Sequence, residues 1–289
     1  MNKFYLLDKW LDFSSFDVIR VLRKTLNIRK MWHTGTLDPL ATGGLLIATW
    51  NYTKLIPYFE KDKKTYEFTI NLDWTTDSFD LAEKINFLDI VLQKKYKKEL
   101  TKEKIEQVLK EKFTWTITQI PPKYSALKIN WKRACDLVRE WKEVEMKTRE
   151  ISILNIKILN YNYPSLSLIA EVTAWTYIRS IADDLWSILW TGWYITKLRR
   201  TKIGSIDIAL WQTLDEFELN KHLDIKELFK NKEFISLNDD ILEKINNWLK
   251  IKGDFEYKIW EDLFVCNENN EVTNIVVYDW KILSAKRKI

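Results

Sequence analysis

Glycine is scarce in this chain. Only 6 of its 289 residues are glycine, although the usual share of about 7% would give about 20. Tryptophan is in large excess, with 15 residues. Proline contributes 5 residues, so a collagen-like or proline-rich low-complexity chain is excluded. To explain the glycine deficit and the tryptophan excess, the positions at which the tryptophans stand must be considered.

Cysteine, histidine and long apolar runs are also rare. The cysteines, Cys135 and Cys266, are widely separated, and the chain has 2 histidines. We therefore expect a reduced, cytoplasmic protein without a metal framework. The apolar stretch at residues 45–50 is far shorter than the roughly 18 residues of a membrane span. The first residues run directly into the charged pair Asp8 and Lys9, so we expect no signal peptide.

The rest of the composition is typical of a folded, globular protein. Hydrophobic residues make up 46% and charged residues 30% of the chain, which excludes a disordered chain. The net charge of +5 is compatible with a polyanionic partner but does not establish one.

Hydrophobic periodicity predicts helices and strands in alternation. No glycine-rich loop joins a strand to a helix, so a nucleotide-binding Rossmann or P-loop fold is not expected. The pattern favours an α+β protein with a mixed sheet, with a boundary near residues 215–230 that separates domains at 1–215 and 225–289. The predicted helices span 16–26, 101–113 and 178–189, and the predicted strands span 65–72, 151–161, 166–172 and 272–278.

The most unusual stretch is HTGTLDPLATGG, residues 33–44. Its glycines and proline place Asp38 on a tight loop rather than in a regular element. On spacing alone, an Asp-Pro turn with Asp38 as a helix cap is one interpretation. The functional alternative is a carboxylate that acts as nucleophile or base, since aspartate is ionised at neutral pH.

Three further stretches combine tyrosines or leucine with cations. Residues 61–66 place Tyr66 after a basic run, residues 176–180 place Tyr177 and Arg179 at a helix start, and residues 198–202 hold three cations. Such residues suit base stacking and phosphate contact. Taken singly, none of these stretches decides for function, since a core tyrosine, an ordinary surface helix and a solvated basic turn are their structural alternatives.

Together with residues 119–128, these stretches resemble, in order and spacing, the motifs of the TruB family of tRNA pseudouridine synthases. The resemblance covers about residues 4–205. It implies a mixed, largely antiparallel central sheet with flanking helices and a small β-rich C-terminal domain. It also implies that a monomer binds the T-arm of tRNA and converts the uridine at position 55 to pseudouridine without cofactor or metal. An RNA-binding protein that folds tRNA without chemistry is the alternative, which the intact Asp38 disfavours.

The resemblance assigns roles to individual residues. Asp38 falls on the catalytic aspartate, and Arg179 would be its counter-charge. Tyr66 would stack on the flipped uracil, and His33 would occupy the space that the base leaves. The other candidates are Tyr177 and Leu198 as pocket residues, and Lys9, Lys128, Arg199 and Arg200 as RNA backbone contacts.

Many tryptophans stand where the turns of this family call for glycine. Glycine serves such sites because it adopts positive φ or permits close backbone approach. We therefore predict that many of them are glycine in the native protein, through a codon that is read differently in its source. Asp12 and Asp73 also stand at expected glycines, and Trp10 stands at an expected proline. The suspect tryptophans are Trp32, Trp50, Trp115, Trp131, Trp141, Trp175, Trp186, Trp190, Trp193 and Trp280.

Overall fold

The computed structural model describes residues 2–75, 86–87, 89–122, 125, 127–129, 132–140, 144–189, 194–207, 211–218 and 220–289. Its main feature is a nine-stranded sheet. The strands are β1 (Phe4–Lys9), β2 (Met31–His33), β3 (Ala41–Thr49), β4 (Lys64–Asn71), β7 (Trp115–Gln119), β10 (Arg149–Asn162), β11 (Ser165–Val172), β12 (Tyr194–Ile203) and β13 (Ile206–Asp207).

The main sheet is mixed and largely antiparallel. Its order is β1-β3-β12-β4-β11-β10-β7, with β2 paired to β3 and β13 paired to β12. Strands β3 and β12 run parallel, and the other described neighbours run antiparallel. The strands predicted at 151–161 and 166–172 correspond to β10 and β11, which pair as an antiparallel hairpin. Together with the flanking helices, this arrangement confirms the predicted α+β fold class.

Helices flank the main sheet, and their ends follow ordinary capping rules. Helix α1 begins after Ser14, whose side chain accepts from the Asp17 N–H in a capping box. Thr101 caps α4 by accepting from the Lys104 N–H with its side chain. No helix in the described ranges has the length and apolar character to cross a bilayer. The helices here are α1 (Ser15–Leu26), α2 (Ile56–Glu60), α3 (Ile90–Glu99), α4 (Lys102–Lys112), α5 (Ala134–Arg139), α6 (Ile178–Leu189) and the 3-10 helix η1 (Trp50–Leu55).

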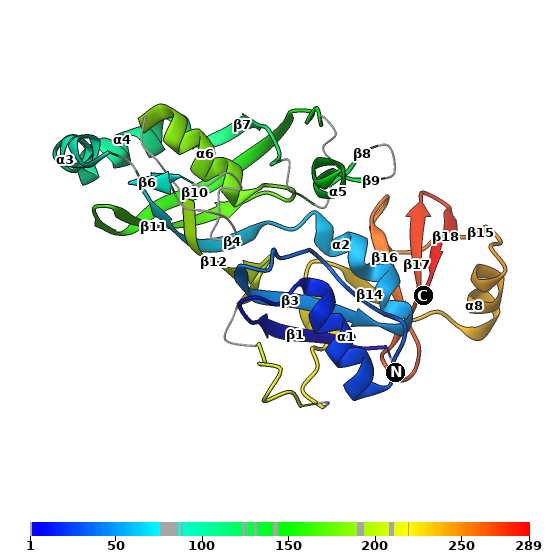
Figure 1. Cartoon of the computed structure of the whole chain (residues 1–289). Helices are drawn as coiled ribbons and strands as arrows, with labels where there is room; N and C mark the ends of the chain where they lie inside the picture. The colour runs from blue at the N-terminus through cyan, green and yellow to red at the C-terminus, as the bar shows by residue number, and fades with distance from the viewer. Residues whose placement is uncertain are drawn as a thin grey trace.

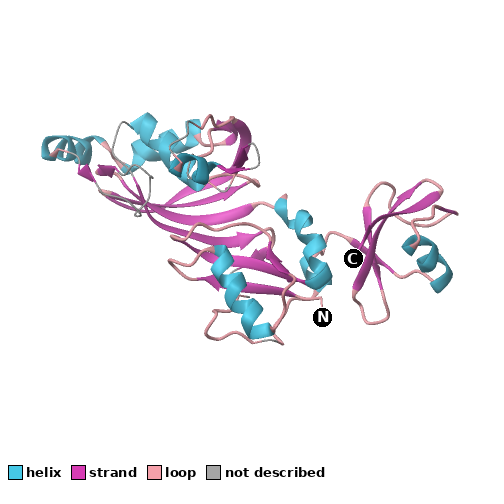
Figure 2. Ribbon diagram, turned by 45° about the vertical axis from the view of Figure 1, so that its right-hand side comes forward, coloured by secondary structure: helices cyan, strands magenta, loops and turns pink. Residues whose placement is uncertain are grey.

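A second sheet and its helix α8 (Asp239–Asn246) form one end of the molecule (Figures 1 and 2). Its order is β14-β16-β17-β18-β15. The basic residues 286–288 belong to its strand β18. The elements of this part are α7 (Ile225–Leu228), β14 (Glu233–Ile235), β15 (Ile251–Lys252), β16 (Asp262–Cys266), β17 (Val272–Asp279) and β18 (Ile282–Lys288). Elsewhere, two small two-stranded sheets pair β5 (Trp74–Thr75) with β6 (Asn86–Phe87) and β8 (Lys128–Ile129) with β9 (Lys132–Arg133).

Strand β3 is buried on both faces, because successive side chains of a strand point to opposite sides. Leu45 and Ile47 pack with the apolar face of α1. Leu46 and Ala48 belong to a different cluster, which also contains residues of η1, α2 and the second sheet. This arrangement explains why the strand reads as a continuous apolar run.

An aromatic cluster joins the two sheets. Phe229 lies 4.6 Å from Phe59 and 4.9 Å from Phe264 between ring centroids, and Phe4 of β1 lies 5.3 Å from Phe59. The second sheet therefore packs directly on the first through a shared core. The division into domains at 1–215 and 225–289 stays a prediction.

Replacement of Phe264 by alanine tests this shared core. The side chain is fully buried, so Phe264→Ala should lower the free energy of unfolding by about 3–5 kcal/mol. Urea denaturation followed by fluorescence and circular dichroism should show one coincident transition at a lower midpoint. Phe16→Ala, at a side chain that is 42% exposed, is the control and should change little. Two separate transitions would contradict the shared core.

Candidate active site

A cavity of about 500 Å³ lies beside the loop at residues 34–40, between β2 and β3. Strands β4 and β12 and the start of α6 form its other walls. Most of the sequence-predicted site residues line it, although they are far apart in the chain. They are His33, Asp38, Tyr66, Tyr177, Arg179, Leu198 and Arg200.

The loop is fixed on both sides of Asp38. The buried Ser15 hydroxyl donates to the Leu37 carbonyl at 3.0 Å and accepts from the Leu37 N–H at 2.8 Å. On the other side, the Lys9 ammonium donates to the Pro39 carbonyl at 3.1 Å. Of the two neighbouring serines, Ser14 caps α1 and Ser15 holds this loop.

Asp38 forms an ion pair with Arg179. The distance from Arg179 Nη2 to Asp38 Oδ2 is 3.0 Å, and the side chains are 5% and 33% exposed respectively. A charge-assisted bond of this kind orients the carboxylate, while a third of the Asp38 side chain stays accessible. The capping interpretation of Asp38 is wrong, because the chain after it turns into β3, with the Ala41 N–H bonded to the Asp38 carbonyl at 3.0 Å.

Close approach of the β3 and β12 backbones places β12 beside the start of β3, directly after this loop. Gly43 has φ of 97°, and a Cβ there would lie 2.2 Å from the Arg200 carbonyl oxygen, so glycine is required. Leu198 and Arg200 face the cavity from alternate positions of β12. Tyr66 of β4, which is paired with Arg200, lines the cavity beside them.

Comparison with known proteins identifies the family. Residues 23–178 match the TruB family pseudouridylate synthase, N-terminal domain. The chain belongs to this family. It is 40% identical over 203 residues to tRNA pseudouridine synthase B of Endomicrobium trichonymphae, covering 70% of this chain and 85% of that protein. It is 34% identical over 292 residues to the enzyme of the same name from Mycoplasma mobile, covering 99% and 96%.

Solved structures show the same fold. A chain in the crystal structure of a Cbf5-Nop10-Gar1 complex superposes with a TM-score of 0.69 at 20% identity, covering 99% of this chain and 84% of that one. A chain of an archaeal box H/ACA sRNP Nop10-Cbf5 complex superposes with a TM-score of 0.68 at 18% identity, covering 99% and 85%. The resemblance stated from the sequence motifs is thereby confirmed for the family and the fold.

Lys9 is not placed to contact RNA. Its side chain is fully buried, and its ammonium donates to the carbonyls of Trp10, Phe13 and Pro39. Burial lowers the pKa of Lys9 to about 8. The expected phosphate contact is therefore wrong, because the ammonium is occupied by backbone carbonyls and has no access to solvent.

Arg200 is also buried, at 2% exposure. Its Nε donates to the Gly44 carbonyl at 2.8 Å, and its Nη2 donates to the Gly35 carbonyl at 3.0 Å. The expected phosphate contact is wrong here too. Arg200 instead fastens the start of the Asp38 loop to β3 and β12.

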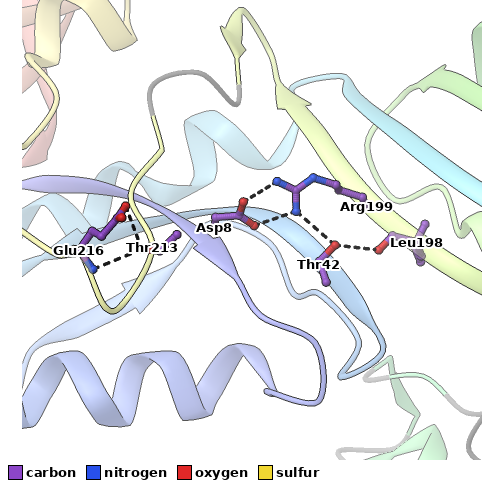
Figure 3. Close-up of polar contacts among 6 residues, drawn as sticks. All are labelled: Asp8, Thr42, Leu198, Arg199, Thr213 and Glu216. Atoms are coloured by element: carbon purple, nitrogen blue, oxygen red, sulfur yellow. Dashed lines mark hydrogen bonds and ion pairs between the residues drawn. The ribbon is translucent and has the colours of Figure 1, made fainter.

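Arg199 points away from the cavity, as the alternation of β12 requires. Its guanidinium donates to Asp8 of β1 at 2.9 Å and to Thr42 at 3.3 Å, and Thr42 in turn donates to the Leu198 carbonyl (Figure 3). About a third of the Arg199 side chain is exposed, so its contact with the RNA backbone stays a prediction. The Lys128 side chain lies outside the described residues, as do Trp131, Trp141, Trp190 and Trp193.

The role of Gln119 is not predicted by the sequence analysis, although this residue belongs to the family-like stretch at residues 119–128. Gln119 is fully buried, and its amide accepts from the Tyr177 N–H at 2.8 Å and donates to the Tyr177 carbonyl at 3.1 Å. Ser180 adds a bond to the Ile120 carbonyl at 2.7 Å. These bonds join the end of β7 to the start of α6 and so position Arg179.

Gln119→Leu should show this positioning role. The substitution leaves the Tyr177 N–H without its partner, whereas the Tyr177 carbonyl keeps its bond from the Ile181 N–H at 3.2 Å. We expect a loss of about 1–3 kcal/mol in unfolding free energy. Displacement of Arg179 should also lower kcat at least tenfold, since small misplacements are costly. Gln107→Leu, at an exposed pair with Glu111, is the matched control. Unchanged kcat in Gln119→Leu, measured by pseudouridine formation, would refute the role.

His33 provides a pH test. Burial, with a smaller effect from Arg200, lowers the pKa of His33 from 6.5 to about 4, and the ring of Trp32 stacks on it at 5.2 Å. The unfolded chain therefore takes up a proton before the folded chain does, so stability falls as pH drops from about 6.5 to 4. From pH 7 to pH 5 the loss should be about 2 kcal/mol.

Urea denaturation across this pH range would measure the effect of His33. His33→Gln should remove the part of the pH dependence that His33 contributes. In Trp32→Gly, the uncovered imidazole should titrate closer to its ordinary value, as followed by NMR. An imidazole that is protonated at pH 6 in the folded protein would contradict this account.

Proposed function

We propose that this chain converts the uridine at position 55 in the T-loop of tRNA to pseudouridine, with Asp38 as the nucleophile on a flipped-out base. The coarser activity, isomerisation of uridine to pseudouridine in tRNA, follows from membership of the TruB family. In this proposal a monomer binds the T-arm in the cytoplasm and needs no cofactor.

The observation that carries the proposal is the Asp38–Arg179 pair in the wall of the cavity. Arg179 orients the carboxylate through a charge-assisted bond and leaves a third of the Asp38 side chain accessible. The loop on both sides of Asp38 is fixed by buried partners. A nucleophile that is held in place before the substrate arrives loses little entropy in the reaction.

Aromatic side chains around Asp38 suit an extruded base. Flipping a nucleotide out of its stack costs a few kcal/mol, and base–aromatic stacking returns about 1–3 kcal/mol. Tyr66 and Tyr177 line the cavity. The Arg149 guanidinium lies 4.5 Å from the Tyr177 ring centroid, which fixes that ring by a cation–π contact. We assign stacking on the uracil to Tyr66, and further lining of the base pocket to Tyr177 and Leu198.

The isomerisation balances without a further reactant. The bond between N1 of uracil and C1′ of the ribose breaks, and a bond from C5 to C1′ forms. The hydrogen on C5 leaves as a proton, and N1 gains one. Asp38 can serve by attack on the sugar or on the base, because each route needs one ionised carboxylate.

Asp38→Asn tests the nucleophile. The amide keeps the shape of the side chain but removes its charge and nucleophilicity, so release of tritium from C5-labelled T-arm RNA should fall below detection. Asp207→Asn is the matched control, since that carboxylate is 46% exposed in a surface pair with Lys202 and should leave turnover unchanged. Turnover by the Asp38→Asn variant would show that Asp38 is not the nucleophile.

Mapping of the product separates the nucleophile from the substrate position. Pseudouridine found at another position of the tRNA by the active protein would reject position 55 and leave Asp38 in place. Binding of tRNA without any turnover by the unmodified chain would instead favour an RNA-folding protein on the same scaffold.

A further inference from the structure

Tryptophan dominates the left-handed backbone positions of this structure. Among the residues that the structure describes, nine that are not glycine have φ between 49° and 68°, and six of these are tryptophan. The other three are Asp12, Asn27 and Asn270. Asparagine and aspartate tolerate this region because their short side chains bond locally, whereas a bulky residue there is an outlier. The six are Trp50, Trp115, Trp175, Trp248, Trp260 and Trp280.

Packing of the indole rings does not account for these conformations. All six side chains are exposed, from 43% at Trp50 to 79% at Trp115. A strained backbone conformation persists only where the surrounding structure imposes it. Here the turns impose the positive φ, and contacts of the indole rings do not. These positions therefore require the left-handed backbone conformation, while a large side chain there contributes little packing.

Two of the turns have well-defined residue requirements. Trp248 follows the C-cap of α8, with its N–H bonded to the Ile245 carbonyl at 3.0 Å and the Leu249 N–H bonded to the Lys244 carbonyl at 2.9 Å. This is the Schellman motif, in which the left-handed residue is usually glycine. Trp280 is the first residue of the two-residue β17–β18 hairpin loop, where positive φ again favours glycine.

We propose that these six positions are glycine in the native protein, because its source organism reads as glycine a codon that is written here as tryptophan. The inference extends the sequence prediction to Trp248 and Trp260, which that prediction did not include. Glycine at these six positions would raise the glycines from 6 to 12 and lower the tryptophans from 15 to 9, which reduces both compositional anomalies.

One of the six positions bears on the site. Trp175 lines the Asp38 cavity and is 64% exposed. Glycine at position 175 would remove an indole from the rim of the cavity and widen the entrance for a nucleotide. This consequence rests on the proposed function, whereas the identity of the residues does not.

Peptide mass spectrometry of protein from its native source tests the residue identities directly. Trypsin should release residues 245–250, which include position 248, and residues 259–281, which include positions 260 and 280. We expect masses and fragment ions for glycine at all three positions. Tryptophan at these positions would overturn the proposal, whatever the activity of the protein.

Thermal denaturation of recombinant protein gives a second test. Replacement of all six tryptophans by glycine should raise Tm by about 10 °C or more, because removal of the backbone strain at each position should raise Tm by a few degrees. Trp211→Gly is the control: its ring packs against Gly44 and the core cluster, so its loss should lower Tm. A sixfold variant no more stable than the original chain would overturn the proposal.

The activity of Trp175→Gly tests the consequence for the site. A wider rim should raise kcat/KM for T-arm RNA several-fold, whereas Trp280→Gly, on the distant hairpin, should leave it unchanged. An unchanged kcat/KM in Trp175→Gly would overturn the rim assignment. If no variant turns over RNA, the proposed function fails, while the peptide masses still decide the residue identities.

Discussion

The position of Asp38 depends on buried cations that bind backbone carbonyl groups. Lys9 and Arg200 are almost fully enclosed, and their donors reach carbonyls at Pro39, Gly35 and Gly44. A buried charge is costly unless it is hydrogen-bonded, and a loop carbonyl away from water has the same requirement. Each group satisfies the other, so the loop that carries Asp38 is held in one conformation before any substrate binds.

The topology explains how such distant residues meet. The parallel pairing of β3 with β12 places residues 198–200 beside residues 41–43, directly after the loop. The antiparallel pairing of β12 with β4 adds Tyr66. Helix α6 then follows β11 and is fastened to the end of β7 by Gln119. The ion pair between Arg179 and Asp38 closes this arrangement from the opposite wall.

Much of this arrangement could be predicted from the sequence. Periodicity located α1, α4, α6 and the β10–β11 hairpin, because each buries one regular face. The motifs identified the residues around Asp38, because they occur together in order and spacing. The burial of Lys9 could not be predicted, since a cation in a sequence does not reveal which partners enclose it. Strand alternation could have shown that Arg199 and Arg200 face opposite sides of β12, and that neither shares the surroundings of the other.

The six tryptophans at positive φ meet a local requirement of their turns that is separate from the contacts that hold Asp38. A left-handed conformation costs a non-glycine residue about 1–2 kcal/mol, so six such positions would cost about 6–12 kcal/mol. The free energy of unfolding of a whole domain is about 5–15 kcal/mol. A chain with tryptophan at all six positions would therefore lose most of its stability to this strain. The groups that hold Asp38, among them Lys9, Ser15, Gln119 and Arg200, lie outside these turns. Relief of the turns would therefore stabilise the fold without disturbing the contacts on which the site depends.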